Sequence, residues 1–274
     1  MTSLAGKTLF ITGASRGIGL AIGLRAARDG ANVIIAAKTV EPHPKLPGTI
    51  HTAAAEIEAA GGHALAVQCD VRSEGDITNA VAQGVERFGG IDVVVNNASA
   101  IRLGGVEAVD AKAFDLMTSI GPRATYVVTR AALPHLERAT NAHILTLSPP
   151  IALGSTWVGD APAYTFKKYG MTLLTLGFAA EFRRRGIAAN TLWPRTVIAT
   201  AAVQNLLGGD AVIRASRRPE IVADAAHAIL TSDARKTTGN TYVDEDLLRA
   251  NGVTDFAAYA VDPDTPLGTD IFLD

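Results

Sequence analysis

The sequence of 274 residues is poor in cysteine and has no excess charge of either sign. It contains one cysteine, Cys69, and 25 Lys and Arg against 27 Asp and Glu. A single cysteine excludes a disulfide framework within the chain and a zinc site with several cysteine ligands. We interpret Cys69 as a small buried apolar residue. The balanced charge leaves no electrostatic footprint for nucleic acid or for an anionic membrane surface.

Long hydrophobic runs and metal-binding clusters are missing as well. The longest uncharged stretch, 142–159, contains two prolines, a histidine and several hydroxyl groups, which makes it a poor membrane span. The six histidines form no closely spaced pair and have no acidic cluster beside them, so no metal site is predicted. The first residues enter a strand pattern without a leader-like segment. We therefore expect a soluble, cytoplasmic protein with no membrane span and no nucleic-acid partner.

Short apolar runs alternate with amphipathic stretches along most of the chain. Runs that are apolar on both faces are typical of parallel strands covered by helices, and helical crossovers connect such strands. The predicted strands are Thr8–Thr12, Asn32–Ala37, Ala64–Gln68, Ile91–Asn96, His143–Leu147, Ala188–Trp193 and Asn240–Val243. The predicted helices are Ile18–Asp29, Thr52–Ala60, Ser73–Phe88, Ala111–Glu137, Ala163–Arg185 and Pro219–Thr231. The expected fold is α/β: a single doubly wound Rossmann-type domain with a seven-stranded, mainly parallel sheet.

Two stretches interrupt this alternation. Residues 40–48 carry three prolines, which exclude a continuing strand or helix and predict a long loop after the second strand. The acidic stretch from Asp244 onward loses the alternation of strands and helices. We therefore expect one domain over residues 1–244, and a C-terminal tail over 245–274 that packs on the same domain or on a partner subunit.

The first predicted strand leads into a glycine-rich turn, Thr12–Gly19, and a helix follows at once. Glycines let the backbone turn sharply and approach a pyrophosphate, and the start of the helix offers free N–H groups to the phosphates. Because no lysine follows Gly19, a phosphate loop of the kinase or ATPase type is excluded. The turn therefore predicts a dinucleotide-binding site.

Residues at the ends of the second and third strands bear on the type of dinucleotide. An acid at the end of the second strand would favour NAD, but Lys38 stands there and no acid precedes Glu41. Lys38 and Arg16 suit a 2′-phosphate, which predicts NADP(H), and both also fit plain surface cations. Asp70 fits equally well a hydrogen bond from the adenine amino group or a cap on the next helix.

Tyr164 and Lys168 lie four residues apart at the start of a predicted helix and so share one face. A tyrosine hydroxyl is too weak an acid for general acid/base work at neutral pH unless a nearby cation lowers its pKa. The Lys168 ammonium would do this, and it would also reach the ribose hydroxyls of a nicotinamide nucleotide. The pair predicts an acid/base centre, although the same spacing also occurs on ordinary amphipathic helices.

Four motifs in this order resemble the short-chain dehydrogenase/reductase family over residues 7–243. They are TGASRGIG at Thr12–Gly19, NNAS at Asn96–Ser99, YTFKK at Tyr164–Lys168 and TGN at Thr238–Asn240. Three further segments are more similar to the hydroxysteroid dehydrogenase-like 2 branch of that family, whose longer members carry a sterol-carrier domain for which this chain leaves no room. These segments are HPKLPGTI at His43–Ile50, SPP at Ser148–Pro150 and WPRT at Trp193–Thr196.

The resemblance implies roles for particular residues. Tyr164 would exchange a proton with the substrate oxygen, Lys168 would lower its pKa and hold the ribose, and Lys38 would select NADP. Asn96 would support the cofactor region, and the backbone near Thr196–Ile198 would meet the nicotinamide amide. The phosphates would be lined by Gly13, Ser15, Arg16, Gly17, Ile18 and Gly19. Segments 111–137 and 163–185 would form the surfaces of a homodimer or homotetramer.

Two departures from the family pattern affect the helpers of this centre. The family's relay asparagine falls on Gly121, which Pro122 follows, so we expect a broken or kinked helix there with Ser119 as a partial substitute. The family's serine lies thirteen residues before the tyrosine, and that position is Ile151 here. Ser148 is the candidate that replaces it, and it also fits a hydroxyl that caps a strand end.

The expected function is an NADP(H)-dependent interconversion of a carbonyl and a secondary alcohol. The alternatives are an NADP(H)-binding module with little catalysis and, with less support from the glycine spacing, an epimerase or dehydratase for nucleotide sugars. Several apolar residues favour a bulky hydrophobic substrate, although core packing explains them equally well. They are Leu153, Trp157, Met171, Trp193, Ile198, Leu206 and Leu207.

Overall fold

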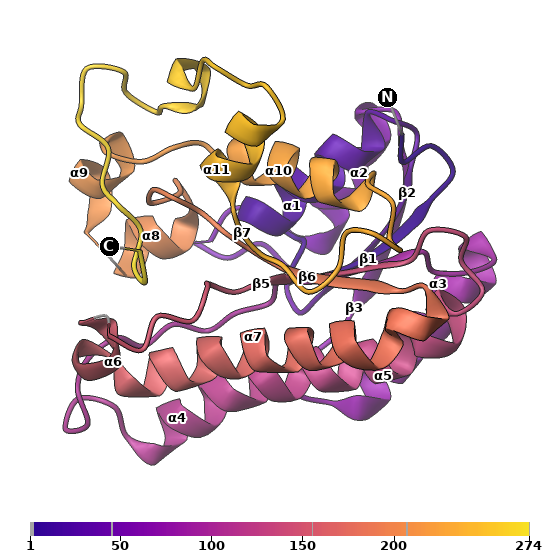
Figure 1. Ribbon diagram of the computed structural model, residues 1–274, viewed down its shortest axis with the longest axis horizontal. Helices are drawn as coiled ribbons and strands as arrows, with labels where there is room; N and C mark the ends of the chain where they lie inside the picture. The colour runs from indigo at the N-terminus through magenta and orange to yellow at the C-terminus, as the bar shows by residue number, and fades with distance from the viewer. Residues whose placement is uncertain (1–2, 45, 155, 207, 274) are drawn as a thin grey trace.

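In the computed structural model, which describes residues 3–44, 46–154, 156–206 and 208–273, a seven-stranded parallel sheet lies between two layers of helices (Figure 1). The strand order is β3-β2-β1-β4-β5-β6-β7. The strands are β1 (Thr8–Thr12), β2 (Asn32–Ala37), β3 (His63–Gln68), β4 (Val93–Asn96), β5 (His143–Leu147), β6 (Ala188–Trp193) and β7 (Thr241–Val243). The predicted doubly wound α/β fold with seven strands is confirmed, and every pairing between the described strands is parallel.

Each face of the sheet has its own apolar core. On one face, α1 (Gly17–Ala27), α2 (Ile50–Ala59) and α10 (Glu220–Leu230) pack against alternate strand residues such as Leu9 and Ile11. On the other face, α3 (Glu74–Phe88), α5 (Ala124–Leu136) and α7 (Pro162–Phe182) pack against Phe10 and Ile34. Since successive residues of a strand point to opposite faces, strands buried on both sides must be apolar throughout. None of the helices described is long and apolar enough to cross a bilayer.

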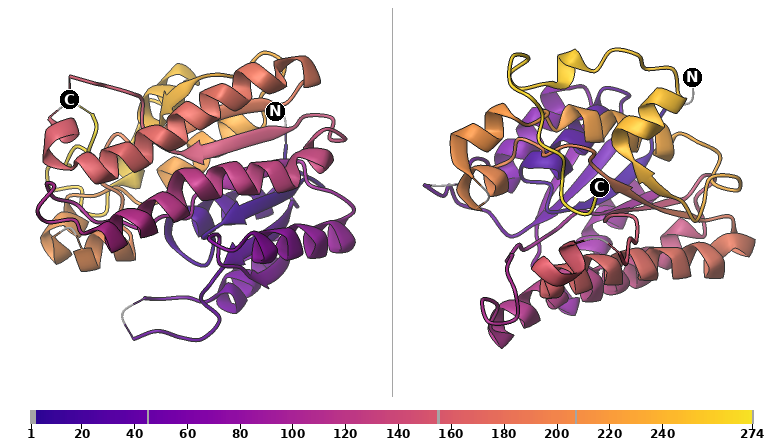
Figure 2. Two further views of the ribbon diagram at one scale, coloured as in Figure 1. Left: turned by 90° about the horizontal axis from the view of Figure 1, so that it is seen from below. Right: turned by 60° about the vertical axis from the view of Figure 1, so that its left-hand side comes forward.

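The segment predicted as one helix over 111–137 is two helices joined by an irregular turn. α4 (Ala111–Thr118) passes through a π-helical turn, η1 (Ser119–Arg123), into α5. Pro122 lies inside η1, and a proline removes a backbone donor, so the wider turn lets the chain continue in nearly the same direction. Figure 2 shows α7 running beside the α4–α5 pair. The predicted irregularity at Gly121 is confirmed as a π turn.

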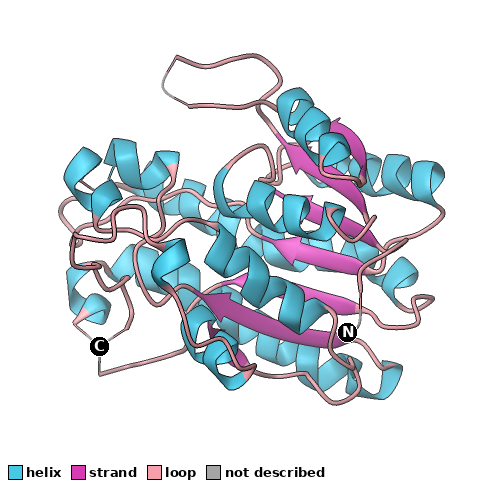
Figure 3. Ribbon diagram, turned by 90° about the horizontal axis from the view of Figure 1, so that it is seen from above, coloured by secondary structure: helices cyan, strands magenta, loops and turns pink. Residues whose placement is uncertain are grey.

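The proline-rich segment is the predicted loop between β2 and α2, and it projects from the body of the molecule (Figure 3). Its described part includes a bridge between His43 and Leu46. Lys45, within this segment, lies outside the described residues. The base of the loop returns to the glycine-rich turn, since the Arg16 guanidinium donates hydrogen bonds to the carbonyls of Pro47 and Gly48.

The C-terminal tail packs back onto the domain and has regular structure that the sequence did not predict. α11 (Asp244–Ala250) follows β7 directly, and the short 3-10 helix η3 (Ala257–Tyr259) comes after it. Phe256 enters the core beside α10, and Thr269 forms a β-bridge with Thr196 after β6. Other short helices are α6 (Trp157–Asp160) after β5, the 3-10 turn η2 (Arg183–Arg185) at the end of α7, and α8 (Ala201–Leu206) and α9 (Gly209–Arg214) after β6. The last residues of the tail thus reach the carboxyl edge of the sheet.

Candidate functional site

A large hollow of about 870 Å³ lies at the carboxyl ends of the strands. Sequence order reverses between β1 and β4, and ligands of doubly wound sheets bind outside this reversal point. The cleft extends from the glycine-rich turn at Gly13, past Lys38 and Asp70, to Tyr164 and Lys168. The fold therefore brings most of the predicted site residues into one cleft.

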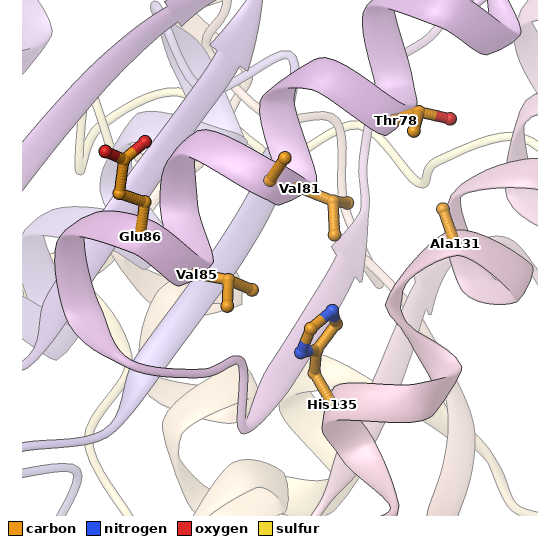
Figure 4. A pocket seen from close by; sticks show the side chains of 7 residues that line it. Thr78, Val81, Val85, Glu86, Ala131 and His135 are labelled. Atoms are coloured by element: carbon orange, nitrogen blue, oxygen red, sulfur yellow. The ribbon is translucent and has the colours of Figure 1, made fainter.

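A second, smaller hollow of about 500 Å³ lies between α3 and α5 (Figure 4). It is lined mainly by aliphatic side chains, with Glu86 and His135 as its titratable groups. Burial lowers the pKa of His135, which favours a neutral imidazole there. Most of the predicted site residues line the first cleft instead.

The glycine-rich turn has the geometry of an anion-binding loop. Gly13 and Gly17 have φ of 69° and 58°, in the left-handed region that favours glycine. A Cβ on Gly13 would lie 3.0 Å from the Ala98 Cα, so the turn can pass this close to β4 only without a side chain. Arg16, which precedes α1, is extended and makes no side-chain cap, so the first N–H groups of α1 are available to a phosphate.

An asparagine that the sequence analysis did not select holds this turn in place. The Asn97 amide donates hydrogen bonds to the carbonyls of Thr12 and Gly13, at 2.8 and 3.2 Å. Asn96, the predicted cofactor residue, instead points to the opposite side, where its amide donates to Thr129 of α5. Because adjacent residues of a strand face opposite ways, only one of the two asparagines can reach the turn. The motif itself could not distinguish them.

Gly19 does not line the cleft; its lack of a side chain allows close packing at the start of α1. A Cβ there would lie 2.5 Å from the Asn97 Nδ2 and 3.0 Å from the Gly13 carbonyl oxygen. Gly13, Ser15, Arg16, Gly17 and Ile18 line the cleft, as predicted for phosphate contact. Gly19 instead lets α1 approach the turn and the asparagine that holds it.

The side chains of Lys38, Asp70 and Arg72 lie together at the end of the cleft away from Tyr164. The Lys38 side chain is 58% exposed, and its ammonium lies 3.7 Å from the Asp70 carboxylate. The Arg72 guanidinium donates to both carboxylate oxygens of Asp70, which lowers the pKa of that acid to about 2. The helix after Asp70 is capped by the Ser73 side chain instead, so the alternative of Asp70 as the helix cap is wrong. Asp70 remains available as an acceptor at the cleft wall.

Tyr164 and Lys168 lie together on α7 at the inner end of the cleft, and both are buried. The Lys168 ammonium donates a 2.7 Å hydrogen bond to the Leu147 carbonyl at the end of β5 and sits 4.7 Å above the Trp193 ring. Burial lowers the pKa of Lys168 to about 7. A lysine in this setting changes its charge near neutrality, which suits a group that exchanges protons.

An acid from the C-terminal tail faces this pair. Asp270 lines the cleft, its pKa is raised to about 7 by burial, and its carboxylate acts to raise the pKa of Lys168. Burial and Asp270 together raise the pKa of Tyr164. In this arrangement burial dominates the pKa of the tyrosine, and the lowering of that pKa by Lys168 stays a prediction.

The same tail segment supplies the centre of an aromatic cluster. Phe272 is 2% exposed and contacts four rings, with centroid distances of 5.5 to 6.2 Å, from Trp157, Tyr164, Tyr169 and Trp193. Its φ of 72° lies in the left-handed region, which a bulky side chain rarely adopts. Trp193 also donates a hydrogen bond to the Ile271 carbonyl. The tail thus packs directly on the ring of Tyr164, a contact that no local pattern could predict.

The two hydroxyl helpers suggested by the sequence do not reach this cleft. Ser148 is fully buried, and its hydroxyl accepts a hydrogen bond from Thr172 of α7. Ser119 donates to the Asp115 carbonyl within its own helix. A different hydroxyl, that of Ser99 after β4, lines the cleft and hydrogen-bonds to Tyr164, which acts to lower the pKa of the tyrosine. Ser99 lies in the quoted NNAS motif but was not singled out.

The predicted apolar wall is present in part. Trp157, Trp193, Ile198 and Leu206 line the cleft, and Val197 adds the expected backbone segment after β6. Leu153 is exposed and Met171 is buried elsewhere, so neither lines the cleft. Leu207 lies outside the described residues. The part of the chain that the structure describes contains no cluster of His, Cys, Asp and Glu that could hold a metal ion.

Comparison with known proteins decides the family. A family model described as short chain dehydrogenase matches residues 7–209. The chain belongs to this family. Hydroxysteroid dehydrogenase-like protein 2 of Danio rerio is 56% identical over 271 residues, which are 99% of this chain and 65% of that relative. The chain therefore spans less than two thirds of the length of this relative.

Solved structures of the family include near relatives of the whole chain. A structure from Xanthomonas campestris is 57% identical with a TM-score of 0.96, and 99% of each chain is covered. A short chain dehydrogenase from Mycobacterium thermoresistibile is 56% identical with a TM-score of 0.94, over 99% of this chain and 96% of that one. Among more distant members, a carveol dehydrogenase from Mycobacterium avium is in complex with NAD and a metagenomic oxidoreductase is in complex with NADP. The family binds nicotinamide cofactors.

The residues of this chain fit such a dinucleotide. The turn at Gly13 and Gly17 presents backbone without side chains, and the start of α1 leaves its N–H groups free of a side-chain cap. Cations at Arg16 and Lys38 border the same cleft that ends at Tyr164. A group with phosphates at one end and a reacting ring at the other would extend along it.

Substituting Gly19 tests whether the turn needs this close approach. We expect Gly19→Ala to weaken NADPH binding at least tenfold, because its Cβ would displace Asn97 and overpacking costs roughly 1–3 kcal/mol. Fluorescence titration with NADPH measures this. The matched control is Gly75→Ala, near the start of α3, where the nearest atom would be the Ser73 Oγ at 3.8 Å. Equal affinities for both variants and the wild type would contradict the packing role.

Proposed function

We propose that the protein is an NADP(H)-dependent oxidoreductase that interconverts a carbonyl and a secondary alcohol, with Tyr164 as the general acid/base. The observation that carries the proposal is the single cleft that joins the glycine-rich turn to the Tyr164–Lys168 pair. Family membership supports oxidoreductase chemistry. Since the chain spans 65% of the Danio rerio relative, the activity and substrate of a whole protein of that length are part of the proposal as well.

The bound nicotinamide would supply the hydride chemistry, and the protein would supply binding, orientation and proton transfer. Tyr164, whose pKa is raised, carries its proton at neutral pH and would donate it to the substrate oxygen during carbonyl reduction. Lys168 is held against the Leu147 carbonyl and would bind ribose hydroxyls at the inner end of the cleft. Trp157 and Phe272 would exclude water from the reacting atoms.

The cleft wall supports a hydrophobic substrate. Trp157, Leu206 and Val212 are among the residues that line it, and the Asp270 carboxylate acts on both Tyr164 and Lys168. A carboxylate there disfavours an anionic substrate group by like-charge repulsion. We therefore propose a neutral carbonyl compound with a sizeable apolar part. Within the family, the alternative of a cofactor-binding module with little catalysis stands on the buried Ser148 and on Gly121.

Replacing Tyr164 separates the enzyme from the binding module. We expect Tyr164→Phe to lower the turnover of NADPH with a panel of apolar aldehydes, ketones and 3-ketoacyl thioesters by about 10²- to 10⁴-fold, because the proton donor is lost. Steady-state kinetics measures this. Tyr126→Phe, which alters an exposed tyrosine of α5, is the control and should retain full activity. Turnover that persists in Tyr164→Phe would overturn the proposed mechanism.

The preference for NADP(H) is part of the proposal. It rests on Lys38 at the end of β2, where no acid stands, and on Arg16, which the carbonyls of Pro47 and Gly48 hold at the cleft wall. Both guanidinium and ammonium groups suit a phosphate. Asp70 would accept from the adenine amino group at the same end of the cleft.

Removing the charge of Lys38 tests this preference. We expect Lys38→Met to weaken NADPH binding about tenfold and to leave NADH binding unchanged, since only NADPH carries the 2′-phosphate. Lys112→Met, an exposed lysine of α4, is the charge-matched control. Competition titrations with both nucleotides give the ratio. An unchanged ratio of NADPH to NADH affinity would remove Lys38 from the selectivity site.

We also propose that the protein forms a homodimer or homotetramer through α4, α5 and α7. The outer side of this layer exposes large apolar side chains, among them Phe166 and Leu173, which are 59% and 61% exposed. Phe166 stacks on Phe114 of α4 at 5.7 Å, so the exposed groups of neighbouring helices adjoin. Apolar patches of this kind are typical of interfaces. The cytoplasmic location stays a prediction of the sequence.

A charge placed on this layer tests the assembly. We expect Leu173→Glu to convert the oligomer into a smaller species that remains folded, because a carboxylate would be buried in the interface. Light scattering after size-exclusion chromatography measures the mass, and circular dichroism checks the fold. Val106→Glu is the control, since Val106 is 83% exposed on a loop. An unchanged mass for Leu173→Glu would place the interface elsewhere.

A further inference from the structure

A second lysine of α7 is buried beside the catalytic pair and has no role in the mechanism above. Lys167 has no exposed surface, and its ammonium lies 5.0 Å from the centre of the Tyr164 ring. It donates hydrogen bonds to the Ser99 hydroxyl at 2.5 Å and to the Ala100 carbonyl at 2.9 Å. Among the residues that the structure describes, no carboxylate lies within ion-pair distance of it.

The space for this side chain comes from Gly121 in the π turn. A Cβ on Gly121 would lie 2.5 Å from the Lys167 Cγ and 2.8 Å from its Cε. Any side chain at position 121 would therefore displace the aliphatic part of Lys167 from its path toward the loop after β4. The irregular turn and the absence of a side chain at 121 together let the amine reach Ser99.

Ser99 connects this amine to the reacting oxygen. Its side chain is exposed in the cleft, accepts from Lys167 and hydrogen-bonds to Tyr164. When Ser99 accepts from Lys167, its own O–H is free to point elsewhere, and Tyr164 is the acceptor within reach. Lys167 thus determines which way the serine hydroxyl points.

The stability of the fold alone does not explain a lysine at position 167. Burial of an amine without a carboxylate partner costs free energy, and an apolar side chain of similar length would fill the same space without this cost. Burial and the neighbouring Lys168 ammonium both lower the pKa of Lys167. Two acceptors face the amine, and two N–H groups remain even when it is neutral, so its contacts hold in either charge state.

We propose that Lys167 is a positioning residue for the reaction: its amine orients the Ser99 hydroxyl to donate a hydrogen bond to the Tyr164 oxygen, which stabilises the phenolate once the proton has left. The inference rests on the proposed function. Tyr164 also faces Asp270, which disfavours the phenolate, and it shares a helix face with Lys168, whose ammonium would favour the phenolate. The Ser99 hydroxyl is a third group that affects the stability of the phenolate, and Lys167 sets its orientation.

The test is the pH dependence of kcat/KM for alcohol oxidation, in which Tyr164 must lose its proton to act as base. We expect Lys167→Met and Ser99→Ala each to move the rise in activity upward by about one pH unit, because a hydrogen bond to the phenolate is lost. The double variant should show no larger shift than Ser99→Ala alone, since Lys167 acts through that serine. Lys236→Met, 83% exposed at its side chain, should show no shift.

A second measurement separates positioning from simple packing. The midpoint of urea unfolding without cofactor should stay the same or rise in Lys167→Met, because a buried amine is replaced by an apolar group. A lower midpoint with an unshifted pH profile would show a structural role and overturn the proposal, as would additive shifts in the double variant. Tyr164→Phe is assayed in parallel. If this variant retains turnover, the proposed function fails. If Tyr164→Phe loses turnover while Lys167→Met and Ser99→Ala keep the pH profile of the wild type, only the role of Lys167 is overturned.

Discussion

The chemical end of the cleft depends on how α7 is fastened to the end of β5. Lys168 donates to the Leu147 carbonyl, and the hydroxyls of Thr172 and Thr175 donate to Ser148 and to Thr146. These groups are buried, so each contact is made in a medium where an unpaired polar atom would be costly. The row of hydrogen bonds sets the height and rotation of the helix. Tyr164 and Lys167 take their positions from it.

At the other end of the cleft, the glycine-rich turn depends on close contacts between backbone segments. Glycines at 13 and 19 allow the turn, Asn97 and α1 to come within contact distance, and Asn97 ties them together with hydrogen bonds. Arg16 then links the turn to the base of the proline-rich loop through two carbonyls. A phosphate site of this kind is made from main-chain groups, and its side chains serve mainly to hold the main chain still.

The C-terminal tail completes the chemical end of the cleft. Phe272 packs on four aromatic rings, one of them that of Tyr164, and Asp270 brings a carboxylate to Lys168. Burial disfavours the charged form of each group, which lowers the pKa of Lys168 to about 7 and raises the pKa of Asp270 to about 7. The attraction between the two charges acts against both shifts.

The sequence by itself determined the sheet, the crossovers, the glycine-rich turn and the Tyr164–Lys168 spacing. Each of these depends on local periodicity or on residues close together in the chain, so apolar patterning is enough to predict them. It also located the irregularity at Gly121 and Pro122, because proline acts on its own helix.

Only the tertiary structure decided which neighbours the site residues meet. Asn97 rather than Asn96 faces the turn, because the twist and register of β4 select one side of the strand. Ser148 turns inward to Thr172, while Ser99, Lys167 and the tail residues converge on Tyr164 from segments far apart in sequence. Contacts of that kind depend on how elements pack in three dimensions, and no spacing along the chain records them.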